Sequence, residues 1–123
     1  MKAVIYERKS KPYKLVFCDT DKPVPSDDEV LIKIYAVSLN AADYRSMQMG
    51  IIPKRKIFGA DVAGRIESAG KNISMFKPGD EVIGDIAGYG FGGLAEYVTV
   101  PERALVIKPP EISFEEGAAL PMA

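Results

Sequence analysis

The spacing of apolar and polar residues along this chain predicts a structure built mainly from β-strands. The longest alternating run covers residues 29–38, where one set of alternate positions is more uniformly apolar than the other. A period of two residues is that of a β-strand with one face toward a core. Shorter runs of β-forming residues predict further strands at 2–7, 13–18, 60–68, 81–86, 94–100 and 105–107. We expect a hairpin or wide turn at 9–12 to join the first two.

Two segments depart from this pattern and predict short helices. The first begins at Asn40, a favourable N-cap residue, carries Asp43 in its first turn, and ends at Gly50, which suits a helix C-terminus. The second begins with Ser113 and Glu116, which have the spacing of a capping box. The sequence therefore predicts a mainly β domain with one or two short helices.

Glycines after the strand at 81–86 have the spacing of a dinucleotide-binding motif, Gly-x-Gly-x-x-Gly, at Gly88, Gly90 and Gly93. That motif binds pyrophosphate only between a strand and a helix, because the helix N-terminus holds the phosphates. Here the next segment, 94–100, alternates like a strand and is followed by a proline. A glycine loop between two strands is the preferred interpretation, and a dinucleotide fingerprint is the alternative.

Composition excludes several classes of partner. The 123 residues are 47% hydrophobic and carry 16 basic and 17 acidic side chains, a net charge of -1. This is enough apolar material for one compact domain, without the basic excess that nucleic acid binding needs. No apolar run approaches the roughly 20 residues of a membrane span, and charges near the N-terminus interrupt any signal-peptide core. We expect a cytoplasmic protein without nucleic acid or membrane partners.

The supply of metal ligands is equally restrictive. The chain has one cysteine, Cys18, and no histidine. It therefore has no intrachain disulfide, and a tetrahedral zinc site, which normally draws on several Cys and His ligands, is not expected. We predict that the chain binds no metal.

Residues 59–70 and 77–84 carry a resemblance to a known family. They read Gly-Ala-Asp-Val-Ala-Gly-Arg-Ile-Glu-Ser-Ala-Gly and Lys-Pro-Gly-Asp-Glu-Val-Ile-Gly. The stretch resembles the core signature of the medium-chain dehydrogenase/reductase superfamily, in its N-terminal GroES-like catalytic domain, and the likeness extends over nearly the whole chain. In zinc-dependent members a zinc-ligand histidine occupies the place of Ala60, a cysteine ligand that of Asn40, and a proton-relay Ser or Thr that of Ala42. The chain therefore looks like the zinc-independent quinone oxidoreductase branch, which includes the zeta-crystallin type.

The resemblance implies a GroES-like, partly open β-barrel in which residues 1–123 form the catalytic, substrate-side domain. It further implies that NADPH or NADH is bound mainly by a Rossmann domain that is absent from this chain. That missing domain and a small quinone or enone are the expected partners. We expect the 123-residue chain alone to have no reductase activity, because it lacks the nicotinamide site.

Three neighbouring residues are the candidates for the site. The resemblance places the Asn40 amide near the nicotinamide ribose or the substrate, and Asp43 matches an aspartate of the same motif. Both are expected to contribute to cofactor binding. Tyr44 is the candidate catalytic residue, since a quinone or enone carbonyl needs a hydrogen-bond donor and a proton source. The residues alone favour simpler roles: a helix cap for Asn40, a structural anchor of the helix for Asp43 and a packed aromatic for Tyr44.

Two other functions remain open at this point. A stand-alone GroES-like module that binds a partner or oligomerises would need no cofactor domain. A zinc alcohol dehydrogenase is a further alternative, which stoichiometric zinc would support. Apolar residues at 120–123 also suggest association into a homodimer through exposed apolar surface.

Overall fold

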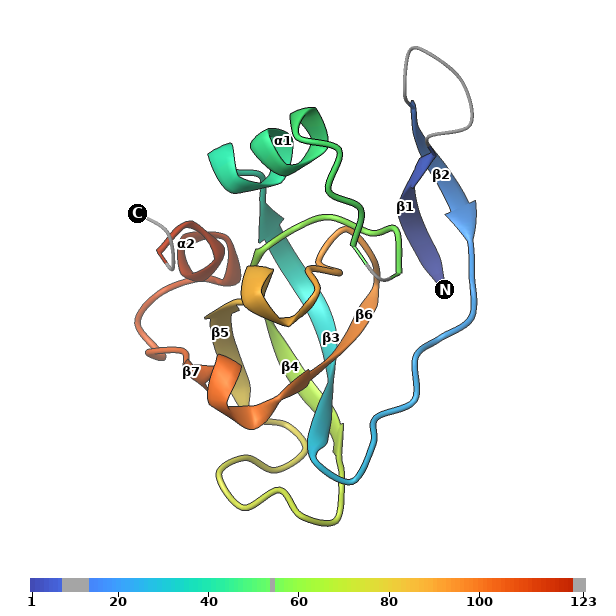
Figure 1. The fold of residues 1–123 in the computed structure, drawn as a ribbon. Coiled ribbons are helices and arrows are strands. Elements are labelled where there is room, and N and C mark those ends of the chain that lie inside the picture. The colour runs from blue at the N-terminus through green and yellow to red at the C-terminus, as the bar shows by residue number, and fades with distance from the viewer. Residues whose placement is uncertain (8–13, 54, 121–123) are drawn as a thin grey trace.

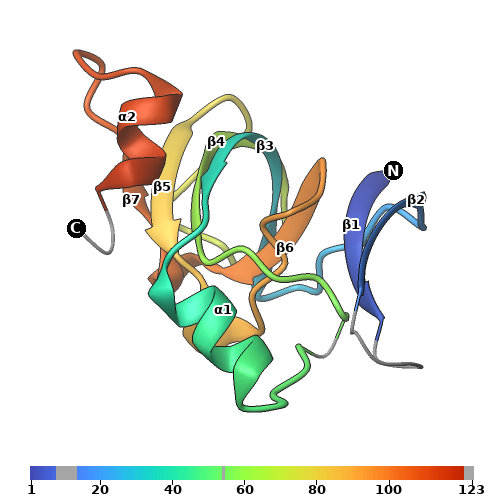
Figure 2. The same ribbon diagram turned by 90° about the horizontal axis from the view of Figure 1, so that it is seen from above.

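The computed structural model describes residues 1–7, 14–53 and 55–120, and it contains two antiparallel sheets (Figures 1 and 2). The smaller sheet pairs β1 (Lys2–Glu7) with β2 (Lys14–Asp19). The larger has the order β6-β3-β4-β5-β7, with bounds Tyr97–Pro101, Glu29–Ser38, Asp61–Ala69, Glu81–Asp85 and Val106–Ile107. The edge strands β6 and β7 do not pair with each other. The expected mainly β, partly open GroES-like architecture is therefore confirmed.

The described residues also contain two α-helices and two 3-10 helices. Helix α1 (Ala41–Gln48) connects the end of β3 to the loop before β4, and α2 (Phe114–Ala119) follows β7. The 3-10 helices are η1 (Ala87–Tyr89) and η2 (Glu102–Ala104). Both predicted α-helices are thus present. None of the helices in the described ranges has the length and apolarity to cross a membrane.

The core forms on one face of the five-stranded sheet. Alternate residues of β3, such as Val30 and Ile32, and residues of β4, such as Val62 and Ile66, have almost no exposed surface. They pack with one another and with residues from β5 and β6 in one cluster. The members of this cluster alternate along each strand as a period of two predicts, because alternate side chains point to the same face. Residues of the opposite face, such as Leu31 and Ala63, are buried as well, and Ala63 packs against Ala118 of α2.

The strand predicted at 94–100 is correct only in its second half. Residues 94–96 pair with β1 instead: Leu94 accepts a backbone hydrogen bond from Val4 at 2.8 Å, and Ala95 forms an isolated bridge with Ala3. The chain then crosses to the larger sheet, where β6 begins at Tyr97. Alternation alone could not reveal this change of partner, since both halves remain extended.

The glycine segment lies between two strands, β5 and β6, which is the interpretation that the sequence favoured. The 3-10 helix η1 and then β6 follow β5, so no α-helix stands behind the motif to hold a pyrophosphate. Gly93 donates a backbone hydrogen bond to the carbonyl of Gly59 at 2.9 Å, which ties this loop to the start of β4. The dinucleotide-fingerprint alternative is therefore wrong for these residues.

The structure differs in detail from the expected end of the first helix, and it does not fully describe two other segments for which the sequence makes predictions. Met49, not Gly50, is the C-cap of α1, and Gly50 follows with a φ of 76°, a left-handed conformation that glycine adopts without strain. The turn at 9–12 lies outside the described residues. So does most of the apolar segment 120–123, of which Leu120 is described and 51% exposed. Homodimer formation remains a prediction.

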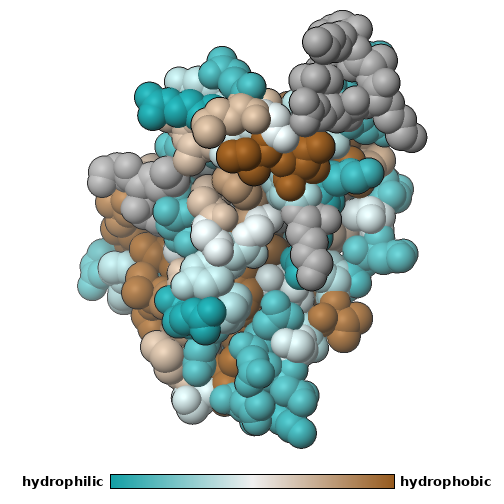
Figure 3. Space-filling model, in the orientation of Figure 1, coloured by the Kyte–Doolittle hydropathy of each residue, from teal (hydrophilic) through white to brown (hydrophobic). Residues whose placement is uncertain are grey.

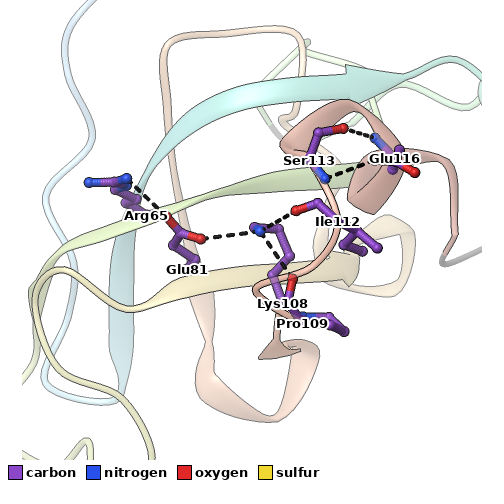
Figure 4. Close-up of polar contacts among 7 residues, drawn as sticks. All are labelled: Arg65, Glu81, Lys108, Pro109, Ile112, Ser113 and Glu116. Atoms are coloured by element: carbon purple, nitrogen blue, oxygen red, sulfur yellow. Dashed lines mark hydrogen bonds and ion pairs between the residues drawn. The ribbon is translucent and has the colours of Figure 1, made fainter.

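A cluster of charged and capping residues fastens α2 to the sheet (Figure 4). Lys108 lies between β7 and α2, and only 4% of its side chain is exposed. Its Nζ lies 3.1 Å from Oε1 of Glu81 on β5, and Arg65 on β4 binds the other carboxylate oxygen of Glu81 at 2.9 Å. The same Nζ donates to the carbonyl of Ile112, at 2.6 Å, just before the helix. One buried cation thus joins the sheet to the start of α2.

This cluster makes stability depend on pH. The hydrogen bond from Lys108 is the main cause that holds the pKa of Glu81 below its ordinary value of 4.5, and the charge of Arg65 adds to it against the effect of burial. A carboxyl whose pKa is lower in the folded state contributes stability above its unfolded pKa and loses it as pH falls through the folded pKa. We expect Glu81→Gln to lower the urea midpoint most at neutral pH, with the two proteins converging below about pH 4. Equal differences at all pH values would contradict this assignment.

Candidate functional site

The end of β3 and the start of β4 bring Asn40 and Asp61 together. Ser38, the last residue of β3, is the register partner of Asp61, the first residue of β4. Asn40 follows two residues after Ser38, and its amide nitrogen donates to Oδ2 of Asp61 at 2.7 Å and to Oγ of Ser38 at 3.1 Å. Asp61 has no exposed surface. The antiparallel pairing therefore fixes the position of the Asn40 amide.

Asp43 holds the start of α1 against the loop before β4. Its Oδ2 accepts from the backbone N–H of Asn40 at 2.9 Å, and its Oδ1 accepts from the backbone N–H of Gly59, also at 2.9 Å. The residue is 1% exposed. Because a helix N-terminus has N–H groups without helical partners and a positive dipole end, a carboxylate here is favourable. The expectation that Asp43 anchors the helix agrees with this geometry.

The three predicted site residues line one groove of about 460 Å³, together with Leu15, Leu39, Ala41 and Met47. Tyr44 is 53% exposed and Leu39 is 61% exposed, so the groove is open to solvent. In Figure 3, hydrophobic surface is visible between α1 and the β1–β2 hairpin, and more of it lies along the edge formed by β7 and α2. The groove therefore combines an apolar wall with an amide and a phenol.

Sequence reasoning missed two residues of this region. Leu15 reaches the groove from β2, and Ser38 accepts a hydrogen bond from the Asn40 amide. Leu15 is 24 positions before Leu39, in a hairpin whose place beside α1 follows from tertiary packing. Ser38 could have been found from the register, since it ends the strand that precedes Asn40.

The hydrogen bonds of Asn40 limit what its amide can do. An amide nitrogen has two N–H donors, and an amide oxygen has two lone pairs. Both N–H groups of Asn40 are directed to protein acceptors, Asp61 and Ser38. A carbonyl group of a bound ligand therefore cannot use them without breaking one of these bonds. The Asn40 oxygen can accept from a ligand hydroxyl.

A catalytic zinc does not fit these residues. In the described part of the chain, no three His, Cys, Asp or Glu side chains lie close enough together to hold a metal ion. At the places of the family's zinc ligands, the Asn40 amide is bonded to Asp61, and Ala60 offers a buried methyl group. Neither group is a ligand that zinc takes in proteins.

Comparison with known proteins places this geometry in a family. Residues 26–111 match the family model described as the alcohol dehydrogenase GroES-like domain. A chloroplastic quinone oxidoreductase of Triphysaria versicolor is 41% identical over 107 residues, covering 82% of this chain and 32% of the relative. A zinc-type alcohol dehydrogenase-like protein of Staphylococcus aureus is 31% identical over 128 residues, covering 99% of this chain and 37% of the relative.

Solved structures agree with this assignment. The quinone oxidoreductase of Pseudomonas syringae pv. tomato superposes with a TM-score of 0.85 at 28% identity, covering 99% of this chain and 38% of that one. The chain spans about a third of the length of the curated relatives. It belongs to the alcohol dehydrogenase GroES-like domain family of the medium-chain dehydrogenase/reductase superfamily.

Proposed function

We propose that this chain is the catalytic, substrate-side domain of an NAD(P)H-dependent oxidoreductase that reduces quinones or activated enones without zinc. The observation that carries the proposal is the groove beside α1, in which Asn40 and Tyr44 lie next to apolar side chains. Asn40 and Ala60 also occupy the places of two zinc ligands in the zinc-dependent members that the sequence resembles. Similarity to proteins named quinone oxidoreductases supports the substrate class.

The proposed reaction depends more on the relative orientation of the cofactor and the acceptor than on a metal ion. When bound, the reduced nicotinamide supplies a hydride to an electron-poor carbon of the acceptor, a proton joins the acceptor, and oxidised nicotinamide leaves. The apolar wall formed by Leu15, Leu39 and Met47 gives the acceptor ring a surface to pack against, which fixes its orientation toward the cofactor. Because quinones and enones are already electrophilic, this positioning suffices without a Lewis acid.

Tyr44 and Asn40 have different roles in this proposal. The Tyr44 hydroxyl donates a hydrogen bond to the carbonyl oxygen, where negative charge develops as hydride arrives. The Asn40 oxygen accepts a hydrogen bond from a ribose hydroxyl of the cofactor, because its N–H groups are bonded to Asp61 and Ser38. Asp43 acts indirectly on the cofactor side, since both of its oxygens accept backbone N–H groups.

The cofactor itself is expected to be held mainly by residues outside these 123. The relatives are about three times as long as the segment matched here. NADPH is the preferred cofactor in the proposal, and NADH is the alternative. The non-catalytic alternative is a GroES-like module that binds a partner or a second copy.

The proposal is tested by steady-state kinetics on a protein of the length of its relatives. We expect it to oxidise NADPH in the presence of a quinone at a rate that a zinc chelator leaves unchanged. We expect Asn40→Ala to lower kcat/KM by about 10-fold, the effect of one lost hydrogen bond to a ribose hydroxyl. Asn72→Ala is the matched control, because the Asn72 amide bonds to exposed Asp28 on another part of the surface. The 123-residue chain alone should show no turnover.

Two results would contradict the proposal. Loss of activity on zinc removal would favour the zinc-dependent alternative. A longer protein that binds neither nucleotide and reduces no quinone or enone would favour the non-catalytic module.

A further inference from the structure

The Asn40 amide is connected to α2 through Ser38. The Ser38 hydroxyl donates to the backbone carbonyl of Ala118 in α2 at 2.7 Å, and its oxygen accepts from the Asn40 amide nitrogen at 3.1 Å. A hydroxyl that donates in one direction and accepts in the other has a fixed orientation. The position of the Ala118 carbonyl therefore determines the direction in which the Ser38 oxygen can accept the hydrogen bond from the Asn40 amide.

Helix α2 is in turn held by contacts at its beginning. Lys108 binds Glu81 of the sheet and donates to the carbonyls of Pro109 and Ile112, at 3.2 and 2.6 Å (Figure 4). The ammonium group also lies 5.1 Å from the centre of the Phe114 ring, in the first turn of α2. These contacts join β5 to both the segment before the helix and the helix itself.

Helix α2 packs so closely against the sheet that it has little room to shift. A Cβ built on Gly117 would lie 2.8 Å from Cγ2 of Ile83 and 3.4 Å from Cδ of Lys108. The next residue, Ala118, is 2% exposed and packs with Ile83 and Ala63. Because the helix touches the sheet at van der Waals distance, a small displacement of its first turn moves the Ala118 carbonyl as well.

We infer that Lys108 is a positioning residue for the Asn40 site, acting through α2, the Ala118 carbonyl and Ser38. The catalytic meaning of this inference rests on the proposed function, but the structural connection does not. Lys108 does not line the groove. With its ammonium group removed, Glu81 keeps Arg65 as a partner and the Pro109 carbonyl keeps the backbone N–H of Ile112 at 3.3 Å, while the Ile112 carbonyl loses the donor at 2.6 Å. The segment before α2 then loses its ion pair with β5, and the start of the helix is held to the sheet by packing alone, including the contact between Phe114 and Tyr35.

The test uses the NMR signals of the Asn40 side-chain amide in the 123-residue chain. In Lys108→Met we expect an upfield shift of the amide proton that faces Ser38, because its hydrogen bond lengthens, while the proton that faces Asp61 moves less. Lys108→Arg should restore most of the shift, since a guanidinium group can donate to the same acceptors. Lys77→Met is the matched control, because the Lys77 side chain is 83% exposed and distant in sequence from α2.

A double-mutant cycle separates positioning from general loss of stability. Ser38→Ala removes the connection between α2 and Asn40, so Lys108→Met should no longer shift the Asn40 amide in that background. An unchanged Asn40 signal in folded Lys108→Met, or an equal shift with and without Ser38, would overturn the inference. If Lys108→Met does not fold, Glu81→Gln replaces it, because this variant keeps the ammonium group and weakens its bond to β5. The Asn40 amide shift is then measured with and without Ser38 and judged in the same way.

A second readout shows whether the connection matters for catalysis. In a protein of the length of its relatives, Lys108→Met should weaken NADPH binding by roughly two- to tenfold, the ratio that corresponds to one net hydrogen bond. If the amide shifts as expected but that protein binds no nucleotide, the positioning inference stands and the proposed function fails. If nucleotide binding is normal but the amide does not shift, the inference fails alone.

Discussion

Replacing Asp43 with alanine is expected to lower the free energy of unfolding by about 3–5 kcal/mol, because the buried backbone N–H of Gly59 and the partly buried N–H of Asn40 lose their acceptors. The carboxylate receives the N–H of Asn40 and that of Gly59, both at 2.9 Å, and is 1% exposed. Each N–H left without a partner costs about 1–3 kcal/mol, and loss of the favourable charge at the start of α1 adds up to about 1 kcal/mol. Urea denaturation measures the difference.

Two companion variants make this first result specific. Asp43→Asn should lose about half as much, since an amide has one oxygen and must turn its NH₂ group toward the other backbone donor. Asp27→Ala is the control, because Asp27 is exposed and its side chain lies 3.5 Å from Lys71 in a solvent-accessible ion pair, which should change stability by less than about 0.5 kcal/mol. A loss below about 1 kcal/mol for Asp43→Ala would show that the carboxylate is not the anchor of α1.

Alanine at Gly64 is expected to have a comparable or larger effect, above about 3 kcal/mol, or to prevent folding. Gly64 lies in β4, the central strand of the larger sheet, opposite Ile34 of β3 and Val82 of β5. A Cβ at this position would lie 2.1 Å from the carbonyl oxygen of Lys33. The clash is with backbone, so no change of rotamer relieves it, and β3 and β4 must move apart.

The matched control for the second result is Gly88→Ala. A Cβ at Gly88 meets no atom within 4 Å, and the residue has no left-handed φ that would itself disfavour alanine. We expect a change within about 0.5 kcal/mol for this variant. The comparison uses urea midpoints and the yield of folded protein. Equal stabilities for the two variants would mean that β3 and β4 are not paired in this register.

The sequence predicts local structure well where a residue pattern and its physical cause lie in the same segment. The strand at 29–38 follows from alternation, and the start of α2 follows from the reciprocal hydrogen bonds of Ser113 and Glu116, both 3.0 Å. The strand at 94–100 shows the limit, because an extended segment can change partners without any change in its alternation. Pairing of residues 94–96 with β1 depends on where the N-terminal hairpin packs.

The sequence predicts which segment carries the candidate site, but it does not predict how the side chains of the site bond to one another. Asn40 and Asp43 were identified from one family motif and Tyr44 from its hydroxyl group, and the three residues line a common groove. The bonds from the Asn40 amide to Asp61 and Ser38 follow from the register of β3 and β4, which composition and periodicity do not reveal. The sequence therefore placed the Asn40 amide near the nicotinamide ribose or the substrate, and only the structure shows that its nitrogen donates to Asp61 and Ser38.

Deuterium transfer tests the central claim most directly. A protein of the length of its relatives is given NADPH labelled with deuterium at C4 of the nicotinamide, together with an α,β-unsaturated ketone, and the product is analysed by mass spectrometry and NMR. The account predicts deuterium on the β-carbon of the reduced product, no loss of transfer after zinc removal, and slower transfer in Asn40→Ala. An unlabelled product, or no product from any quinone or enone with either nucleotide, would contradict it.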